Sequence, residues 1–440
     1  GVAYFGSKTT AIPGRVAKVA LGAGNNPPAR VDGIVLNNGE NEIAVAVIDP
    51  CAGYAYFGRD ISPAGKVIKI ALGSSGNTFS RVASTTLDIS EEKLVSAVID
   101  SAAGYAYFGT YTTPGKVIKV ALGGGNTTPT RVGAVTLNAG EDSLWSAVID
   151  ANAGYAWFGT YTTPGRVIKV ALGAGSNPPT RVGAVTLDPG EDYLACAAID
   201  SGAGYAYFGT LTIPGKVVKV ALGSGSNPPT RVGAVTLLSG EELVSSAVID
   251  PEAGYAYFGT ATLTNNPGRV VKVELGTGNN PPTRVGAVTL NSGEQSLVSA
   301  LIDPAAGYAY FGTWTNPGFV VKVALGAGSD PPTRVGAVTL GPGEYNLKAA
   351  GIDTRAGFAY FGSYTVAIPG RVAKVALGAG NNPPTRVGGI VLNNDENKIA
   401  AAVIDPCAGY AYFGRDISPK EKLSRLLSAV TKHPLSVSEQ

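Results

Sequence analysis

The stretch GYAYFGTYTTPGKVIKVALG, residues 104–123, recurs almost unchanged as GYAWFGTYTTPGRVIKVALG at 154–173 and as GYAYFGTLTIPGKVVKVALG at 204–223. A fixed period of about 50 residues indicates one supersecondary unit that is copied many times along the chain. The phenylalanine of its YFG or WFG element marks nine copies, 50 to 53 residues apart: Phe5, Phe57, Phe108, Phe158, Phe208, Phe258, Phe311, Phe361 and Phe413.

One period predicts four short strands, at 105–110, 116–122, 130–137 and 143–150. They are rich in Val, Ile, Tyr, Phe and Thr, and clusters of Gly, Pro and Asn separate them. Four such strands cannot cover both faces of their own sheet. Copies packed face to face around an axis can do so, which predicts an all-β propeller.

The copy numbers predict about eight four-stranded blades in one domain over residues 1–417. There are eight KVxKV-type, eight RVGAVTL-type and eight AVID-type strands, but nine YFG strands. Strand 401–405 would join the N-terminal strands to close the ring. Two alternatives stay open, which are seven blades with one spare repeat and a β-solenoid.

The order SAVID, GYAYFGT, PGKVIKVAL, TRVGAVTL resembles the repeat of YVTN-type β-propellers over residues 1 to about 417. These motifs are short and apolar. The resemblance therefore implies a fold and says little about function.

The repeat pattern ends after Pro419, and residues 418–440 predict a short C-terminal helical tail. Ser418 fits an N-cap, Pro419 the first helical position and Glu421 a capping box. One apolar stripe follows, formed by Leu423, Leu426, Leu427 and Val430. We interpret the helix as a cap over an exposed edge of the ring, or as a docking element for a partner.

The surplus YFG strand and the similarity of residues 2–63 to 358–419 suggest contacts between copies of the protein. Recent tandem duplication is the simpler explanation of the similarity. The residues expected at such contacts are Tyr4, Phe5, Tyr412 and Phe413, together with the tail stripe. Cys51 and Cys407 occupy the same place in two repeats, as inherited small residues or as a disulfide bridge.

Composition excludes several classes of function. The net charge is +2 and charged residues are 15% of the chain, so nothing favours nucleic acid as a partner. There is no apolar run long enough to span a membrane. The one histidine, His433, lies in the tail, which removes most general-base and zinc chemistry from the repeats. The absence of Met suggests a secreted, N-terminally processed protein.

Three repeated polar positions have modest interpretations. The aspartates, such as Asp100 and Asp150, suit turns better than a ring of calcium ligands. The lysines, arginines and GE glutamates, such as Lys119, Arg131 and Glu141, suit weak ion pairs at the blade edges better than a phosphate site per blade. We expect no metal and no cofactor.

One position varies where the rest of the repeat is constant. It follows FGT, FGS or FGR and holds Lys8, Asp60, Tyr111, Tyr161, Leu211, Ala261, Trp314, Tyr364 and Asp416. A core position would resist such variation, so we expect an exposed loop residue that drifts freely or contacts a ligand. Tyr111, Tyr161, Trp314 and Tyr364 are the candidate contacts with a sugar ring or a partner.

The near-identity of the repeats favours a rigid scaffold over a carved active site. The expected function is a non-enzymatic extracellular or cell-surface propeller for self-assembly, adhesion or protein–protein interaction. Its expected partners are copies of itself or other surface proteins. The alternative is a multivalent carbohydrate-binding, lectin-like propeller with glycans as ligands. An enzyme using Asp, Lys and Tyr is the least favoured reading.

Overall fold

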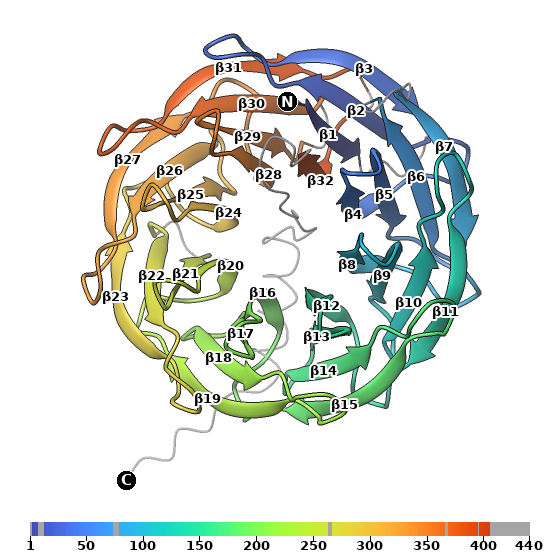
Figure 1. Ribbon diagram of the computed structural model, residues 1–440. Helices are drawn as coiled ribbons and strands as arrows, with labels where there is room; N and C mark the ends of the chain where they lie inside the picture. The colour runs from blue at the N-terminus through green and yellow to red at the C-terminus, as the bar shows by residue number, and fades with distance from the viewer. Residues whose placement is uncertain are drawn as a thin grey trace, which may run out of the picture.

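The computed structural model describes residues 2–7, 13–73, 79–262, 266–365, 368–394 and 396–404. These residues form eight four-stranded antiparallel sheets arranged around one axis (Figure 1). The eight-bladed propeller predicted from the repeats is confirmed, and no repeat is spare among the strands described. The predicted tail helix at 418–440 and the ninth YFG strand lie outside the described residues.

Blade 1 closes the ring, since its strand β32 (Ile399–Ile404) pairs with β1 (Val2–Ser7) from the other end of the chain. Strands β2 (Arg15–Ala20) and β3 (Ala29–Val35) complete its sheet. Each remaining blade consists of four consecutive strands.

Their bounds are as follows: blade 2, β4 (Ile43–Asp49), β5 (Tyr54–Arg59), β6 (Lys66–Leu72), β7 (Phe79–Thr86); blade 3, β8 (Leu94–Asp100), β9 (Tyr105–Thr110), β10 (Lys116–Ala121), β11 (Thr130–Thr136); blade 4, β12 (Leu144–Asp150), β13 (Tyr155–Thr160), β14 (Arg166–Ala171), β15 (Thr180–Thr186). The series continues with blade 5, β16 (Leu194–Asp200), β17 (Tyr205–Thr210), β18 (Lys216–Ala221), β19 (Thr230–Thr236); blade 6, β20 (Val244–Asp250), β21 (Tyr255–Thr260), β22 (Arg269–Glu274), β23 (Thr283–Thr289). It ends with blade 7, β24 (Leu297–Asp303), β25 (Tyr308–Thr313), β26 (Phe319–Ala324), β27 (Thr333–Thr339); and blade 8, β28 (Leu347–Asp353), β29 (Phe358–Ser363), β30 (Arg371–Ala376), β31 (Thr385–Val391).

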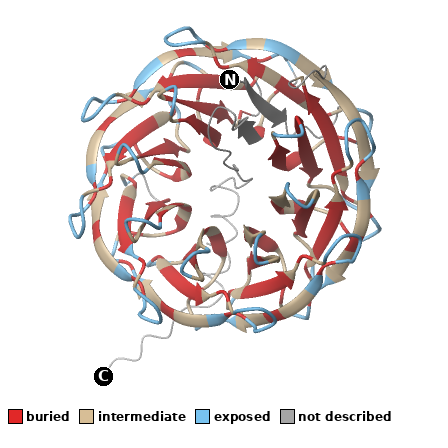
Figure 2. Cartoon of the chain, viewed as in Figure 1, coloured by how far each residue is buried: buried red, intermediate tan, exposed pale blue. Residues whose placement is uncertain are grey.

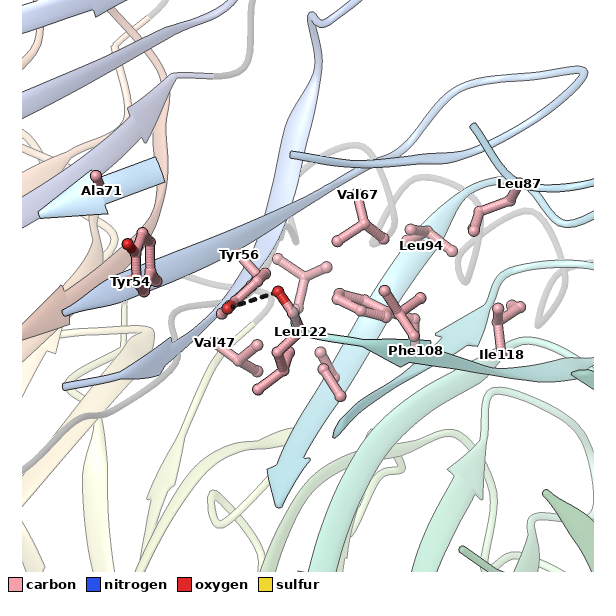
Figure 3. Close-up of a cluster of buried hydrophobic side chains, with 14 residues drawn as sticks. Val47, Tyr54, Tyr56, Val67, Ala71, Leu87, Leu94, Phe108, Ile118 and Leu122 are labelled. Atoms are coloured by element: carbon pink, nitrogen blue, oxygen red, sulfur yellow. Dashed lines mark hydrogen bonds between the residues drawn. The ribbon is translucent and has the colours of Figure 1, made fainter. Parts of the chain in front are cut away.

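The core lies between the blades. In blades 2 to 8 the two middle strands are buried almost throughout, whereas the outer strand is half exposed (Figure 2). Tyr56 and Val67 of blade 2 pack against Leu94 and Phe108 of blade 3 in one such cluster (Figure 3). Each sheet therefore has both faces covered by its neighbours, which is why the strands read as continuous apolar runs.

In blades 2 to 8 the glycine of the YFG element sits where two blades meet. A Cβ on Gly109 would lie 3.0 Å from Leu144 Cβ and 3.2 Å from the Phe158 ring of blade 4. No side chain fits there, so the glycine lets the blades approach closely.

The ring has two different ends. The turn face carries the turns between first and second strands, such as 101–104, and those between third and fourth strands, such as 122–129. The loop face carries the second-to-third hairpins, such as 111–115, and the crossovers to the next blade, such as 137–143.

Candidate functional site

The repeated aspartates of the turn face form turns, as predicted. The Asp100 carboxylate oxygen Oδ1 accepts the Ala103 N–H at 2.9 Å, and the Asp150 carboxylate accepts the Ala153 N–H at 2.9 Å. The same bond recurs in all seven blades whose aspartate is described. No cluster of His, Cys, Asp or Glu suited to a metal ion occurs among the described residues.

Among the described residues, the repeated lysines from Lys69 to Lys374 donate to main-chain carbonyls and not to carboxylates, so the predicted ion pairing is wrong for them. Lys119 Nζ donates to the carbonyl of Gly175 at 2.7 Å and to that of Asn177 at 3.1 Å, both in the next blade. It also lies 3.9 Å from the centre of the Tyr105 ring. Burial lowers the pKa of Lys119, and the Asp100 carboxylate opposes this change. Each of the eight lysines reaches main-chain carbonyls of the following blade, and we call this arrangement the lysine cage.

The repeated arginines and glutamates do form the predicted ion pairs. Arg181 of blade 4 donates from Nε and Nη2 to both carboxylate oxygens of Glu141, which lies in the crossover that enters the blade. Glu141 also accepts the N–H of Asn138. The eighth pair, Arg30 with Glu396, joins blade 1 to the last crossover and helps to close the ring.

These pairs predict a loss of stability in acid. Burial opposes ionisation of Glu141, but hydrogen bonds from Arg181 and Asn138 outweigh it and hold its pKa below the usual value. Its stabilising effect is therefore present above the unfolded-state pKa of about 4.5 and is lost as the pH falls through the folded-state pKa. We expect Glu141→Gln to lower the unfolding free energy by about 1 kcal/mol at pH 7 and to flatten its decline in acid.

Urea unfolding at a series of pH values measures this effect, and Glu252→Gln, at an exposed glutamate on the turn face, is the control. Equal acid profiles for the two variants would contradict the prediction.

A shallow hollow of about 440 Å³ lies on the turn face between blades 4 and 5. Asp150, Tyr155, Trp157 and Ser201 line it together with the turn around Gly223. Its main polar groups already have partners, since Asp150 holds its own turn and Lys169 binds the carbonyls of Gly223 and Gly225. The hollow is thus formed by groups that hold the blades together.

The loop face brings the predicted contact residues together in two groups. Tyr111 and Tyr161 follow the second strands of blades 3 and 4, with their ring centres 6.5 Å apart. Trp145, at the start of β12, lies 5.5 Å from the Tyr111 ring and 4.9 Å from the Tyr161 ring. Tyr193 continues the series at 4.7 Å from Tyr161. We call these four residues the aromatic arc.

The second group lies on blades 7 and 8. The Trp314 and Tyr364 rings are 5.5 Å apart, and Lys348 Nζ lies 4.8 Å from the centre of the Tyr364 ring. Leu211, Leu243 and Ala261 form an apolar cluster on the blades between the two groups, with Tyr161 and Tyr193 against it. On blade 2 the corresponding positions are charged, with Glu42 and Asp60.

Sequence reasoning missed Trp145, Tyr193 and Lys348. The signal was present, because the residues that open the first strand of each blade vary as much as the position after FGT. Ser143, Tyr193 and Leu243, for example, occupy equivalent positions in three repeats.

The first of these opening positions has a left-handed backbone in every blade. Its φ lies between 47° and 54°, and it is held by glutamate, lysine, serine, tyrosine, leucine or asparagine: Glu42, Lys93, Ser143, Tyr193, Leu243, Ser296, Asn346 and Lys398. Two main-chain bonds hold the conformation in blade 4, where Ser143 N–H donates to Thr112 and the Ser143 carbonyl accepts the Tyr161 N–H. We call these opening positions, together with the position after FGT, the rim. Main-chain bonds thus fix the backbone of the rim, and its side chains can vary.

The exposed large apolar side chains also gather on the loop face. Among the described residues they are Ile89, Ile213, Leu238 and Ile368 in loops of this face, with Val35 and Val391 at strand ends beside it. Val31, within β3, is the exception. These side chains are spread over several blades around the ring.

The remaining predicted residues are not brought together by the described structure. Tyr4 and Phe5 lie in β1, between β2 and β32. Cys51 is exposed with a free thiol. Cys407, its partner in the alternative disulfide interpretation, lies outside the described residues, as do Tyr412, Phe413, Leu423, Leu426, Leu427 and Val430. In the described part of the chain, no helix is long and apolar enough to cross a membrane.

Neither a protein-family model nor a curated protein matches the sequence. Solved structures do match. A candidate 6-phosphogluconolactonase from Bacteroides fragilis has a TM-score of 0.55 at 11% identity, covering 77% of this chain and 95% of that one. The periplasmic gluconolactonase of Pseudomonas aeruginosa has a TM-score of 0.54 at 10% identity, covering 78% and 97%.

A third match is Chaetomium thermophilum Sqt1 bound to the N-terminus of ribosomal protein L10. Its TM-score is 0.56 at 12% identity, covering 77% of this chain and 86% of that one. At these identities the matches show the propeller fold, and the fold-level resemblance to propeller repeats is confirmed.

These neighbours correct two expectations about function. The first expectation, that the protein is not an enzyme, was inferred from the uniformity of the repeats. That inference was wrong, because gluconolactonases share the propeller architecture. The extracellular scaffold for self-assembly or adhesion, and its lectin-like alternative, are corrected too. The three neighbours are gluconolactonases and a binder of a ribosomal protein, and none is named as an adhesin, an assembly subunit or a lectin.

Proposed function

We propose that this propeller binds an apolar segment of a partner protein on its loop face, with the aromatic arc as the main contact. The observation that carries the proposal is the coincidence of two features on one end of the ring. The residues of the aromatic arc, whose positions differ from repeat to repeat, and most of the exposed large apolar side chains both lie there.

Variation between the repeats distinguishes residues that the fold requires from residues that are available for binding. The residues that join blades are repeated eight times with little change, because every joint has the same geometry. The rim residues need no particular side chain, since main-chain bonds fix their backbone. Tyr111, Tyr161 and Tyr193 are therefore not required by the repeat, and each remains partly exposed.

The chemistry of the rim indicates the kind of partner. Aromatic rings bury a large apolar area with little loss of side-chain freedom, which suits apolar side chains of a protein ligand. Blade 2 offers charges of both signs beside this surface, in Asp60, Glu42 and the nearby Lys93 of blade 3. A segment with apolar side chains flanked by charged ones matches both. Sqt1, a structural neighbour that binds the N-terminus of a ribosomal protein, is a precedent for the binding of a segment of a partner protein.

Selection from a phage-displayed library of random peptides tests the proposal on the full chain. We expect the selected peptides to be enriched in apolar residues and to bind Tyr161→Ala at least about tenfold more weakly. Ile213→Glu, which adds a charge to the loop face, should weaken them too. Ser176→Glu adds the same charge to an exposed turn-face residue and should leave binding unchanged.

Peptides that bind Ser176→Glu more weakly but bind the loop-face variants normally would place the binding surface on the turn face and would contradict the proposal. A selection that yields no peptide binding wild type better than Tyr161→Ala would also overturn the proposal.

A further inference from the structure

The aromatic arc lies beside two carboxylates, each with a buried oxygen that accepts no hydrogen bond among the described residues. We propose that the arc and these carboxylates, Asp142 and Asp192, form a site for a basic side chain of the partner segment, an arginine above all. This inference rests on the proposed function, because it names the residue that the segment brings to the arc.

The chain places both carboxylates at the arc. Asp192 directly precedes Tyr193, which is a member of the arc. Asp142 directly precedes Ser143, whose carbonyl accepts the Tyr161 N–H at 2.9 Å. Both lie in the crossovers that enter blades 4 and 5, on the loop face. A group bound on the arc would therefore lie next to negative charge.

The burial of these carboxylates is not compensated by a donor. Oδ1 of each is buried and has no hydrogen-bond partner among the described residues. Burial raises the pKa of both carboxyl groups, although Arg166 opposes the change at Asp142. Lys216 opposes it at Asp192. A buried carboxylate without a donor costs free energy, and a cationic ligand would reduce that cost.

The repeat does not require an acid at this position. The equivalent residue is acidic in four consecutive crossovers and neutral in the other four: Glu92, Asp142, Asp192 and Glu242 against Asn41, Gln295, Tyr345 and Asn397. The acidic crossovers enter blades 3 to 6, on the side of the ring that carries the arc. Because a neutral residue serves the same crossover elsewhere, the acids are available for a role other than folding.

The packing of the rings favours a flat cation over a compact one. Neighbouring ring centres in the arc are 4.7 to 5.5 Å apart, so the rings touch and leave no space between them. Trp145 is buried, whereas Tyr111, Tyr161 and Tyr193 are partly exposed. A guanidinium group can stack on such outer ring surfaces and donate two parallel hydrogen bonds to a carboxylate, which an ammonium group cannot do.

The second aromatic group has the opposite charge beside it. The Trp314 and Tyr364 rings also lie on the loop face, 5.5 Å apart. The charged group next to them is Lys348, whose Nζ lies 4.8 Å from the centre of the Tyr364 ring. Like charges placed together oppose binding, so this group should not select arginine. The neighbouring charge, rather than aromatic surface alone, thus decides where arginine binds.

A fluorescence titration of the full chain tests the site without a selected peptide. In the double variant Trp157→Tyr with Trp314→Tyr, Trp145 is the one remaining tryptophan. Tyrosine already occupies both replaced positions in other repeats, as Tyr107 and Tyr364. The probes are N-acetyl-arginine methylamide and its neutral isostere N-acetyl-citrulline methylamide. We expect the arginine probe to change the Trp145 emission saturably and to bind at least about fivefold more tightly.

Adding Asp142→Asn and Asp192→Asn should weaken binding of the arginine probe at least about fivefold. The melting temperature should not fall, since asparagine already stands at this position as Asn41. Asp188→Asn is the matched control, because Asp188 is an exposed carboxylate of the same crossover that pairs with Arg231. It should leave binding unchanged.

A second reporter tests the role of the neighbouring charge. Trp145→Val with Trp157→Tyr leaves Trp314 as the reporter, and valine stands at the first of these positions in another repeat as Val95. Its emission should show no preference for the arginine probe. An equal preference at Trp145 and Trp314 would contradict the role of the carboxylates.

Equal affinity of Trp145 for the two probes would overturn the inference, as would normal arginine binding by the double asparagine variant. The peptide selection separates this result from the proposed function. Selected peptides that bind the arc without a basic residue would support the proposed function and contradict the inference. A selection without binders, together with a positive titration, would overturn the proposed function and support the site.

Discussion

Lys119→Met is expected to lower the unfolding free energy by about 3 kcal/mol, the largest effect of any single substitution considered for this chain. The Lys119 side chain is fully buried, and its ammonium group donates to carbonyls in the turn 173–177 of blade 4. Methionine has a similar length but no donor. The carbonyls of Gly173, Gly175 and Asn177 would thus lose a charged partner.

Lys116→Met is the matched control on the same strand, β10. Lys116 Nζ donates only to the Ser90 hydroxyl at an exposed position, so its replacement should change stability by less than about 0.5 kcal/mol. Urea unfolding followed by circular dichroism gives both values. A difference between the two variants of less than about 1 kcal/mol would show that the cage contributes little to the joint.

Gly183→Ala is expected to destabilise the chain by about 1–3 kcal/mol through a collision between blades. A Cβ at this position would lie 2.6 Å from the Cβ of Pro228 in blade 5. The backbone of Gly183 does not require glycine, so the effect comes from space alone.

The chain itself supplies the compensating change. Glycine occupies this position in every blade that faces a proline, as Gly133 faces Pro178. Ala83 replaces it in blade 2, where the next blade has Thr128 at the proline position. The double variant Gly183→Ala with Pro228→Thr should therefore be more stable than Gly183→Ala alone.

Gly124→Ala is the control for the glycine substitution itself. Its added Cβ would meet nothing within 4 Å, and Ala174 stands at the same place in the next repeat. Thermal unfolding of Gly183→Ala, of the double variant and of Gly124→Ala tests the prediction. Equal melting temperatures for Gly124→Ala and Gly183→Ala would refute the collision.

Most of the fold could be predicted because the same pattern of strands and turns recurs in every repeat. The strand predicted at 105–110 has those bounds, and the one predicted at 143–150 begins a residue later, at Leu144. Alternation of apolar and turn residues is local and survives in every copy, so eight copies leave little doubt about the period. Closure by β32 followed from counting strand types.

The joints and the site could be predicted only in part. The sequence does not show whether a lysine on a strand pairs with a carboxylate or with a carbonyl. The glycine turn that binds Lys119 lies more than 50 residues away along the chain. Trp145 joins Tyr111 and Tyr161 only because a crossover returns the chain to the loop face. Such contacts depend on the curvature of the ring, which no single repeat encodes.

Every joint between blades has the same direction, since each blade extends its lysine to the next one and receives a lysine from the one before it. The joint between blades 8 and 1 follows this rule, with Lys374 donating to the carbonyls of Gly22 and Gly24. An open stack of repeats needs special end units, but this ring has no first or last member in its packing. The packing of the blades therefore has no preferred starting point around the ring.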